Sequence, residues 1–257
     1  MRSFTFLGTG TSVGVPMIGC DCRVCTSDNP RNHRFRCAGL IKLPTGNILI
    51  DTPPELRLQL LRAKVGAIHS VLFTHYHADH LHGLDDLRPI QHFLGQPVPL
   101  FCAEDVEERI RSAFSYAFDS TKPGKIKTYV PNLSFERIKL TPVNVLGEIV
   151  TPVPLIHGNF DLLGFRIKDL AYCTDVNHIP ETSMKLLQNL DILVLDALRD
   201  KPHPAHFNLK QALEIVEILK PKQTYFTHLC HDLDHDEVEA MLPKGVNLAY
   251  DGLTFEF

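Results

Sequence analysis

Long apolar runs and export signals are absent from this sequence of 257 residues. No stretch approaches the roughly 18 consecutive apolar residues that a membrane-spanning helix needs. The N-terminal segment MRSFTFLGTGTS has neither a long apolar run nor a small-residue cleavage site, so nothing in it indicates a signal peptide. We therefore expect a cytoplasmic protein that has no membrane partner.

An excess of basic residues is also absent. The 26 lysines and arginines are outnumbered by 30 aspartates and glutamates, which gives a formal net charge of −4, and no long basic run occurs. Bulk charge therefore does not favour a nucleic-acid partner, although a local basic patch stays open. A G-x-S-x-G motif is missing as well, which argues against a serine nucleophile.

Internal repeats, low-complexity tracts and obvious linkers are not found either. Two runs of expected strands are each followed by helices, which predicts the α+β class. Among the expected elements are a strand over residues 69–75, helices over 85–94 and 104–118, and a strand over 125–132. We expect one domain over residues 1–257, with two sheets packed face to face and helices outside, a four-layer αββα sandwich.

The segment FTHYHADHLHGL holds an unusual density of possible metal ligands. His75, His77, Asp79 and His80 follow an apolar strand, and His82 comes shortly after. Because residues two apart on a strand share a face, His75 and His77 can converge, while Asp79 and His80 come from the first turn of a helix. Imidazole and carboxylate sets of this kind bind zinc, manganese or iron. A solvated histidine-rich loop is the simpler interpretation, but it does not account for this regular spacing of ligand-type residues.

The spacing H-x-H-x-D-H resembles the signature of the metallo-β-lactamase superfamily, and the resemblance extends over nearly the whole chain. It implies the sandwich fold and a dinuclear site with two divalent metal ions. By this resemblance one ion is held by His75, His77 and His157, the other by Asp79, His80 and His228, and Asp175 bridges the two. Asp51 is expected to orient the site rather than to bind metal.

Seven cysteines occur, and three of them form the pattern C-x-C-x2-C at Cys20, Cys22 and Cys25. Without export signals, this odd count indicates reduced thiols and metal binding rather than disulfides. Three thiolates need one more ligand to complete a tetrahedral zinc site. His231 is the candidate, Cys230 is its rival, and buried free cysteines are the alternative.

The opening FLGTGTSVGVPMIGCDCRVC and the later THLCH together resemble one branch of the superfamily. That branch includes the phosphodiesterase accessory protein of the carbon–phosphorus lyase pathway, which has a structural zinc on three cysteines and a histidine. By resemblance His206 protonates the leaving group, with His203 as its rival. Arg31, Arg34 and Arg36 either contact a phosphate or form a solvated basic loop.

The expected activity is a metal-dependent phosphodiesterase that cleaves a small phosphodiester, cyclic ones included. A hydroxide shared by two zinc or manganese ions, or iron, attacks phosphorus, Asp79 orients the water and His206 is the general acid. Alternatives are a tRNA 3′-processing endonuclease, a glyoxalase II-type thioesterase and a non-catalytic metal-binding module. Residues 117–131 are the one candidate for a tRNA-gripping arm. The resemblance also suggests a homodimer.

Overall fold

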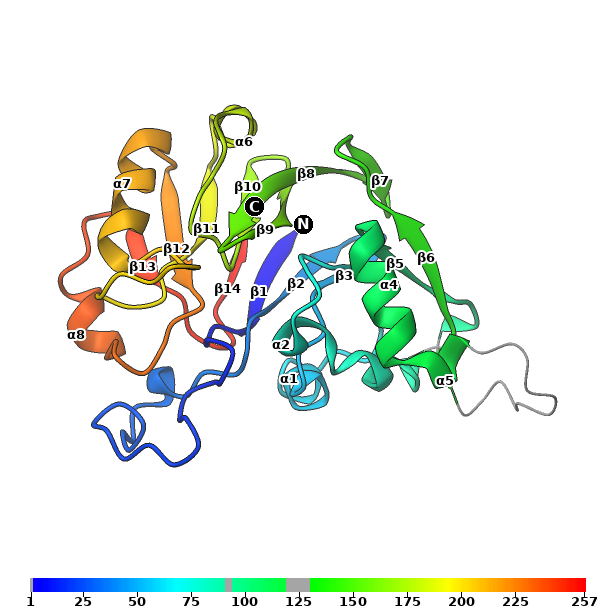
Figure 1. Cartoon of the computed structure of the whole chain (residues 1–257), viewed down its shortest axis with the longest axis horizontal. Coiled ribbons are helices and arrows are strands. Elements are labelled where there is room, and N and C mark those ends of the chain that lie inside the picture. The colour runs from blue at the N-terminus through cyan, green and yellow to red at the C-terminus, as the bar shows by residue number, and fades with distance from the viewer. Residues whose placement is uncertain (1, 91–93, 119–129) are drawn as a thin grey trace.

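The computed structural model describes residues 2–90, 94–118 and 130–257. Their strands form two seven-stranded sheets, ordered β14-β1-β2-β3-β4-β5-β6 and β13-β12-β11-β10-β9-β8-β7 (Figure 1). The first sheet contains β1 (Ser3–Gly8), β2 (Ala38–Leu43), β3 (Gly46–Ile50), β4 (Ser70–Leu72), β5 (Val98–Cys102), β6 (Leu133–Arg137) and β14 (Thr254–Glu256). The second contains β7 (Val143–Val145), β8 (Glu148–His157), β9 (Phe160–Ile167), β10 (Leu170–Cys173), β11 (Ile192–Asp196), β12 (Gln223–Thr227) and β13 (Val246–Leu248).

Helices cover the outer faces of both sheets. They are α1 (Leu56–Arg62), α2 (Ala78–Leu81), α4 (Glu104–Ala113), α5 (Ser115–Phe118), α6 (Glu181–Leu186), α7 (Leu209–Leu219) and α8 (His235–Glu239), with 3₁₀ turns at Pro30–Asn32 and Leu84–Leu87. In the described residues, no helix has the length and apolar character that crossing a bilayer requires.

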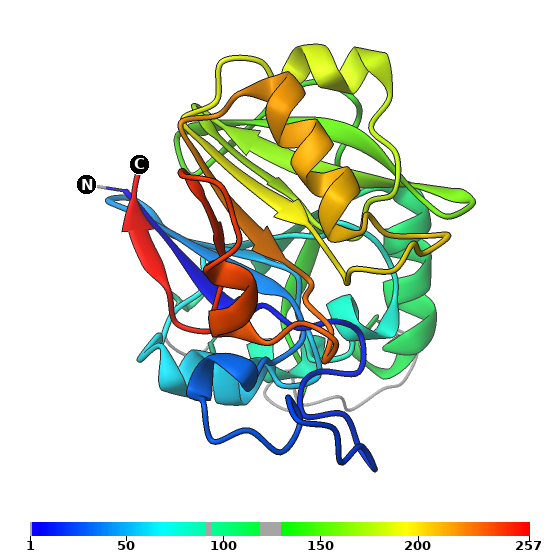
Figure 2. The same ribbon diagram turned by 90° about the vertical axis from the view of Figure 1, so that its left-hand side faces the viewer.

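Three hydrophobic clusters separate four layers. One cluster lies between the sheets and joins Phe4 and Ile48 of the first sheet to Phe165 and Val194 of the second. Another packs α1, α2 and α4 onto the first sheet, and a third packs α7 and α8 onto the second. The expected αββα sandwich is therefore confirmed. The two chain ends lie side by side, where β14 pairs with β1 (Figure 2).

Some expected elements differ in detail. The helix expected over residues 104–118 is interrupted at Phe114, which leaves the helical region (φ −114°, ψ 37°) and is buried beneath the first sheet's helices. The helix expected over 85–94 begins as the 3₁₀ turn Leu84–Leu87, and its residues 91–93 lie outside the described residues. Most of the strand expected over 125–132 also lies outside them, and residues 130–132 are not in a strand.

Parallel pairing determines where the polar residues gather. β3, β4 and β5 run parallel to one another, as do β10, β11 and β12, so their carboxyl ends meet at one rim of the sandwich. The residues of β11 are buried throughout, as expected for a central parallel strand covered on both faces. The rim is therefore built from loops on rigid strands, an arrangement that commonly holds functional side chains.

Gly83 lies where the histidine-bearing segment packs against the loop after β3. Its amide donates to the Thr52 carbonyl at 2.8 Å, and a Cβ at this position would lie 2.0 Å from the Pro53 carbonyl oxygen. We expect Gly83→Ala to lower the free energy of unfolding by about 2–3 kcal/mol, because the backbone must move to admit one carbon. Gly66→Ala is the matched control, since a Cβ there meets nothing within 4 Å. Equal denaturant midpoints for the two variants would contradict this packing.

Candidate metal centre

The loop after β4 carries the first two histidines. β4 ends at Leu72, before His75, and His77 is the N-terminal cap of α2 with an extended backbone (φ −63°, ψ 152°). Strand alternation is therefore the wrong reason for expecting His75 and His77 to converge, because neither residue lies in a strand. The two rings nevertheless come together, with their centroids 4.6 Å apart.

The first group of possible ligands contains His75, His77 and His157, whose ligand atoms all lie within 4.8 Å of one another. His157 Nδ1 is 2.7 Å from the Ala205 carbonyl oxygen, which can only accept, so the proton is on Nδ1 and Nε2 is bare. The Thr74 hydroxyl donates to Asp51 and therefore accepts from His75 Nδ1, at 2.9 Å. His75 Nε2 is then also bare, and it is buried with no hydrogen-bond partner.

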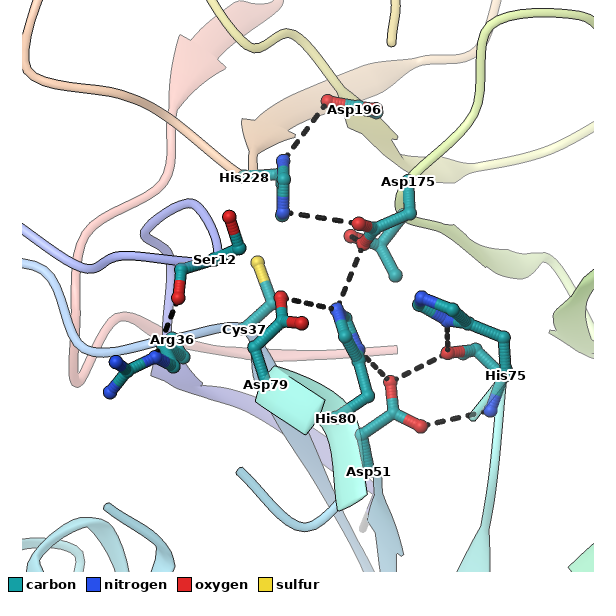
Figure 3. Close-up of polar contacts among 12 residues, drawn as sticks. Ser12, Arg36, Cys37, Asp51, His75, Asp79, His80, Asp175, Asp196 and His228 are labelled. Carbon is teal, nitrogen blue, oxygen red and sulfur yellow. Dashed lines mark hydrogen bonds and ion pairs between the residues drawn. The ribbon is translucent and has the colours of Figure 1, made fainter. Parts of the chain in front are cut away.

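The second group contains Asp79, His80, Asp175 and His228, again with ligand atoms within 4.8 Å of one another (Figure 3). Asp51 Oδ2 accepts from His80 Nδ1 at 2.7 Å, which leaves Nε2 facing the carboxylates of Asp79 and Asp175, each 3.2 Å away. His228 Nε2 lies 3.1 Å from Asp175 Oδ1. Asp175 thus contacts ligand atoms from both sheets.

These side chains fit divalent cations. The Nε2 atoms of His75, His80 and His228 are all buried without a hydrogen-bond partner, although carboxylate oxygens lie close to the last two. Buried polar atoms without partners are costly, and a cation placed between nitrogen and carboxylate oxygen would satisfy both. Imidazole nitrogens with carboxylate oxygens are also the donor set that zinc, manganese and iron accept.

Burial keeps most of these imidazoles neutral, which is the form that binds metal. It lowers the pKa of His157 and His77, and it lowers the pKa of His228 to about 3. His80 differs: burial opposes its charge, but the carboxylates of Asp175 and Asp79 outweigh burial and raise its pKa well above the usual value. A proton on His80 therefore balances the carboxylates in the metal-free site, and a cation would replace it.

Three residues of the site have left-handed backbones within two residues of the end of their strands. They are Asp51 (φ 63°), Asp175 (φ 55°) and His228 (φ 60°). Aspartate and histidine enter this region more readily than most residues, whereas β-branched residues strongly resist it. Such strained positions are typical of functional sites, because the turn directs the side chain back across the strand end.

His206 joins the site from the loop after β11. Its Nδ1 is 2.7 Å from Asp196 Oδ2, and its ring stacks on His228 with centroids 4.6 Å apart and 17° between the planes. Burial opposes the charge on His206, but Asp196 outweighs it and raises the pKa. His203, the rival, lies further out and accepts from the Ala205 amide at 3.2 Å. Ligand atoms of His206 also lie within 4.8 Å of those of His157 and Asp175.

Sequence reasoning missed Asp196. This carboxylate is fully buried, and it accepts from the Val176 amide at 2.9 Å as well as from His206. Burial raises its pKa to about 7, despite the opposing effect of His206. The signal was available in the sequence: ILVLD ends a buried strand in the same way that ILID ends at Asp51.

The cysteine loop forms a separate group away from the histidines. Ligand atoms of Cys20, Cys22, Cys25 and His231 lie within 4.8 Å of one another. His231 Nδ1 is 3.3 Å from the sulfurs of both Cys20 and Cys22. Cys230 is not in this group; its sulfur accepts from the Asp232 amide instead. The structure therefore places His231, rather than Cys230, beside the three cysteines.

The three arginines of this segment differ: Arg31 is about half exposed and lies 3.7 Å from Asp236, whereas Arg34 is buried. Arg34 is 2% exposed and donates to the carbonyls of Cys230 and Leu233, both at 2.7 Å. Arg36 donates to the Ser12 carbonyl at 2.7 Å and pairs with Glu55. Arg34 is therefore neither a solvated residue nor a phosphate ligand. Its guanidinium holds the loop from His228 to Leu233, which includes His231, in place.

A family model described as a beta-lactamase superfamily domain matches residues 46–229. The chain therefore belongs to the metallo-β-lactamase superfamily, a family of metal-dependent hydrolases. A solved structure described as a new diphosphatase from the PhnP family is 42% identical, with a TM-score of 0.93 over 100% of this chain and 98% of that one. Within the superfamily, the chain thus falls in the PhnP-like branch, as the N-terminal cysteine motif and the later THLCH motif predicted.

More distant structures share the fold alone. Zinc-bound PqqB from Methylobacterium extorquens is 17% identical, with a TM-score of 0.80 over 99% of this chain and 100% of that one. The short form of human tRNase Z is 18% identical, with a TM-score of 0.71 over 99% and 98%.

Two curated relatives are longer than this chain. A protein named octanoyltransferase, from Porphyromonas gingivalis, is 34% identical over 96% of this chain and 50% of its own length. A ribonuclease Z of Methanosarcina mazei is 24% identical over 84% and 54%. The chain thus spans about half the length of these relatives, so their names describe proteins with additional sequence.

Cys22 offers a direct test of the cysteine group. The Cys25 amide, followed by His231, lowers the pKa of Cys22 to about 6, whereas burial raises the pKa of Cys230 to about 11. Because the thiolate reacts, iodoacetamide should label Cys22 of metal-free protein with a half-maximal rate near pH 6 and leave Cys230 unlabelled at pH 7. Peptide mass spectrometry gives both rates. Zinc should block Cys22, and equal labelling with and without zinc would argue against a metal site there.

Proposed function

We propose that this protein is a metal-dependent phosphodiesterase that cleaves small phosphodiesters, cyclic ones included. The observation that carries the proposal is the meeting at one rim of two ligand groups joined by Asp175, with the His206–Asp196 pair beside them. The similarity to a PhnP-family diphosphatase supports phosphorus–oxygen chemistry. Zinc or manganese, or iron, would occupy the two ligand groups, and a structural zinc the cysteine group.

Divalent ions in the two ligand groups would supply a nucleophile at neutral pH and would stabilise the charge that develops on the phosphoryl oxygens, as in two-metal hydrolases. The chain's own residues would orient the water molecule and protonate the leaving group. Asp79 is the most exposed member of the second ligand group, at 9%, and its carboxylate oxygen that does not face His80 can orient a water molecule.

His206 is suited to protonate the leaving oxygen. Nδ1 is committed to Asp196, so Nε2 is the atom that can carry a proton toward the substrate. Asp196 fixes this orientation, and its buried carboxylate favours the imidazolium through its charge and its hydrogen bond to the ring. A positioned general acid of this kind contributes roughly 10²–10⁴-fold to rate.

Two other activities use the same ligands. A tRNA 3′-processing endonuclease is supported by the relatives named ribonuclease Z and tRNase Z. The segment that we considered for a tRNA-gripping arm lies mostly outside the described residues, and the net charge of −4 does not favour RNA. Thioester hydrolysis is the other alternative. Precursor tRNA and an acyl thioester are therefore comparison substrates.

Hydrolysis of bis-p-nitrophenyl phosphate tests the class of reaction. We expect turnover that requires added manganese or zinc, and a loss of at least about 100-fold in Asp175→Asn, because both ligand groups lose a shared carboxylate. Asparagine is preferred to alanine since it tolerates the left-handed backbone. Asp169→Asn is the matched control, because that side chain is 63% exposed and pairs with Arg166. Cleavage of the thioester alone, by metal-loaded protein, would overturn the phosphodiesterase proposal.

His206 has its own test. His206→Ala should slow hydrolysis of an alkyl ester by about 100-fold or more, because an alkoxide leaves poorly without a proton. Loss on a p-nitrophenyl ester should be far smaller, since nitrophenolate leaves readily. His203→Ala, which removes a neighbouring ring that does not contact Asp196, should change both rates by less than about 3-fold. Equal losses on both esters in His206→Ala would argue against the acid role.

A further inference from the structure

Three loops carry the residues that must meet at this site. His157 ends β8, Asp175 follows β10, and His206 lies in the long loop between β11 and α7. The last of these loops has the least regular structure of the three, and nothing in its sequence explains how His206 is held against the others. The side chain of Asn177 lies where all three loops meet.

Asn177 makes one hydrogen bond to each of the two other loops. Its Oδ1 accepts from the Gly158 amide at 2.7 Å, directly after His157. Its Nδ2 donates to the Pro204 carbonyl at 3.1 Å, two residues before His206. A carboxamide accepts through its oxygen and donates through its nitrogen while staying neutral, whereas an ionised carboxylate can only accept.

The backbone of Asn177 is itself fixed. Its amide donates to the Ile156 carbonyl at 3.0 Å, and the Ile156 amide donates to the His178 carbonyl at 3.0 Å. The preceding residue, Val176, donates to Asp196 at 2.9 Å and accepts from the Phe207 amide at 2.8 Å. The backbone hydrogen bonds therefore fix the position from which the Asn177 side chain extends. Its two side-chain bonds then set the positions of Gly158 and Pro204.

Close packing makes the arrangement specific. A Cβ on Gly158 would lie 3.4 Å from the Ala205 Cβ, so the turn and the loop are already in contact, and Gly158 is left-handed (φ 61°). The Ala205 carbonyl accepts from His157 Nδ1 at 2.7 Å. Consecutive carbonyls at Pro204 and Ala205 are thus held from two sides, directly before His206.

We propose that Asn177 is a positioning residue that sets His206 against His157 and Asp175 by fastening the three loops together. The assignment rests on the proposed function for its catalytic consequence, but the fastening is a property of the chain with or without metal. The expected loss without Asn177 is in proton donation to the leaving group, because the loop before His206 is released while the ligand groups keep their own contacts.

Two variants and one control test the proposal. Asn177→Ala removes both bonds. Asn177→Asp keeps the acceptor for Gly158 and removes the donor to Pro204, so it separates the two contacts and serves if the alanine variant folds poorly. Asn144→Ala is the matched control, because Asn144 also accepts from a glycine amide, that of Gly147 at 3.0 Å, in the β7–β8 hairpin.

Amide hydrogen exchange, measured on metal-free and metal-loaded protein, reports the fastening without any substrate. In Asn177→Ala we expect the amides of Gly158, Ala205 and Phe207 to exchange on the order of 10-fold faster than in wild type. In Asn177→Asp, Gly158 should stay protected while Ala205 and Phe207 exchange faster. Exchange unchanged from the Asn144→Ala control at these amides would overturn the proposal.

Kinetics separate positioning from general loosening. Asn177→Ala should lower kcat on an alkyl ester on the order of 10-fold with KM within about 2-fold, while a p-nitrophenyl ester loses less than about 3-fold. Metal content should equal that of wild type. Equal losses on both esters, or lost metal, would overturn the positioning role. If wild type cleaves neither ester, the proposed function fails, and the exchange experiment still decides whether Asn177 fastens the loops.

Discussion

The buried carboxylate of Asp51 is the contact on which the rest of the centre depends. It is fully buried and accepts from the Thr74 amide, the Thr74 hydroxyl and His80 Nδ1, at 2.8, 2.8 and 2.7 Å. Burial raises its pKa, while the charge of His80 acts in the opposite direction. Through these bonds one side chain decides which nitrogen of His80 and, by way of Thr74, which nitrogen of His75 faces the ligand groups. The direction in which two imidazoles can bind a cation is therefore set by a residue that need not touch it.

The two halves of the sandwich contribute unequal chemistry to the rim. The first sheet supplies the dense histidine segment and Asp51, whereas the second supplies Asp175, Asp196 and His228 from three neighbouring strand ends. Carboxylates of the second sheet thus face imidazoles of the first across the interface. The N-terminal loop adds a third support, because Arg34 binds the carbonyls that follow His228, and the Thr9 carbonyl accepts from the Leu229 amide at 2.8 Å.

Sequence reasoning recovered the fold and most of the residues that meet at the rim, because ligand-type residues at strand ends leave a local pattern, although Asp196 was overlooked at the end of such a strand. It failed where the structure depends on contacts between distant segments. Arg34 looked like a surface residue, since nothing near it reveals the carbonyls of Cys230 and Leu233 almost 200 positions away. Asn177 was not singled out in the sequence for the same reason, since its partners Gly158 and Pro204 are distant in the chain. The reason given for His75 and His77 was also wrong, because the strand ends early and a turn, not alternation, brings the rings together.

The spread of the site along the chain has a consequence for how the protein is made. Ligand-type residues of the second group run from Asp79 to His228, and the first sheet is completed only when β14, near the C-terminal end, pairs with β1. During synthesis the histidine segment leaves the ribosome long before its partner carboxylates and His228 exist. A nascent chain could therefore hold a cation only through adjacent histidines, and the second ligand group is complete only after β12 has docked. Metal acquisition would then mark the end of folding rather than begin it.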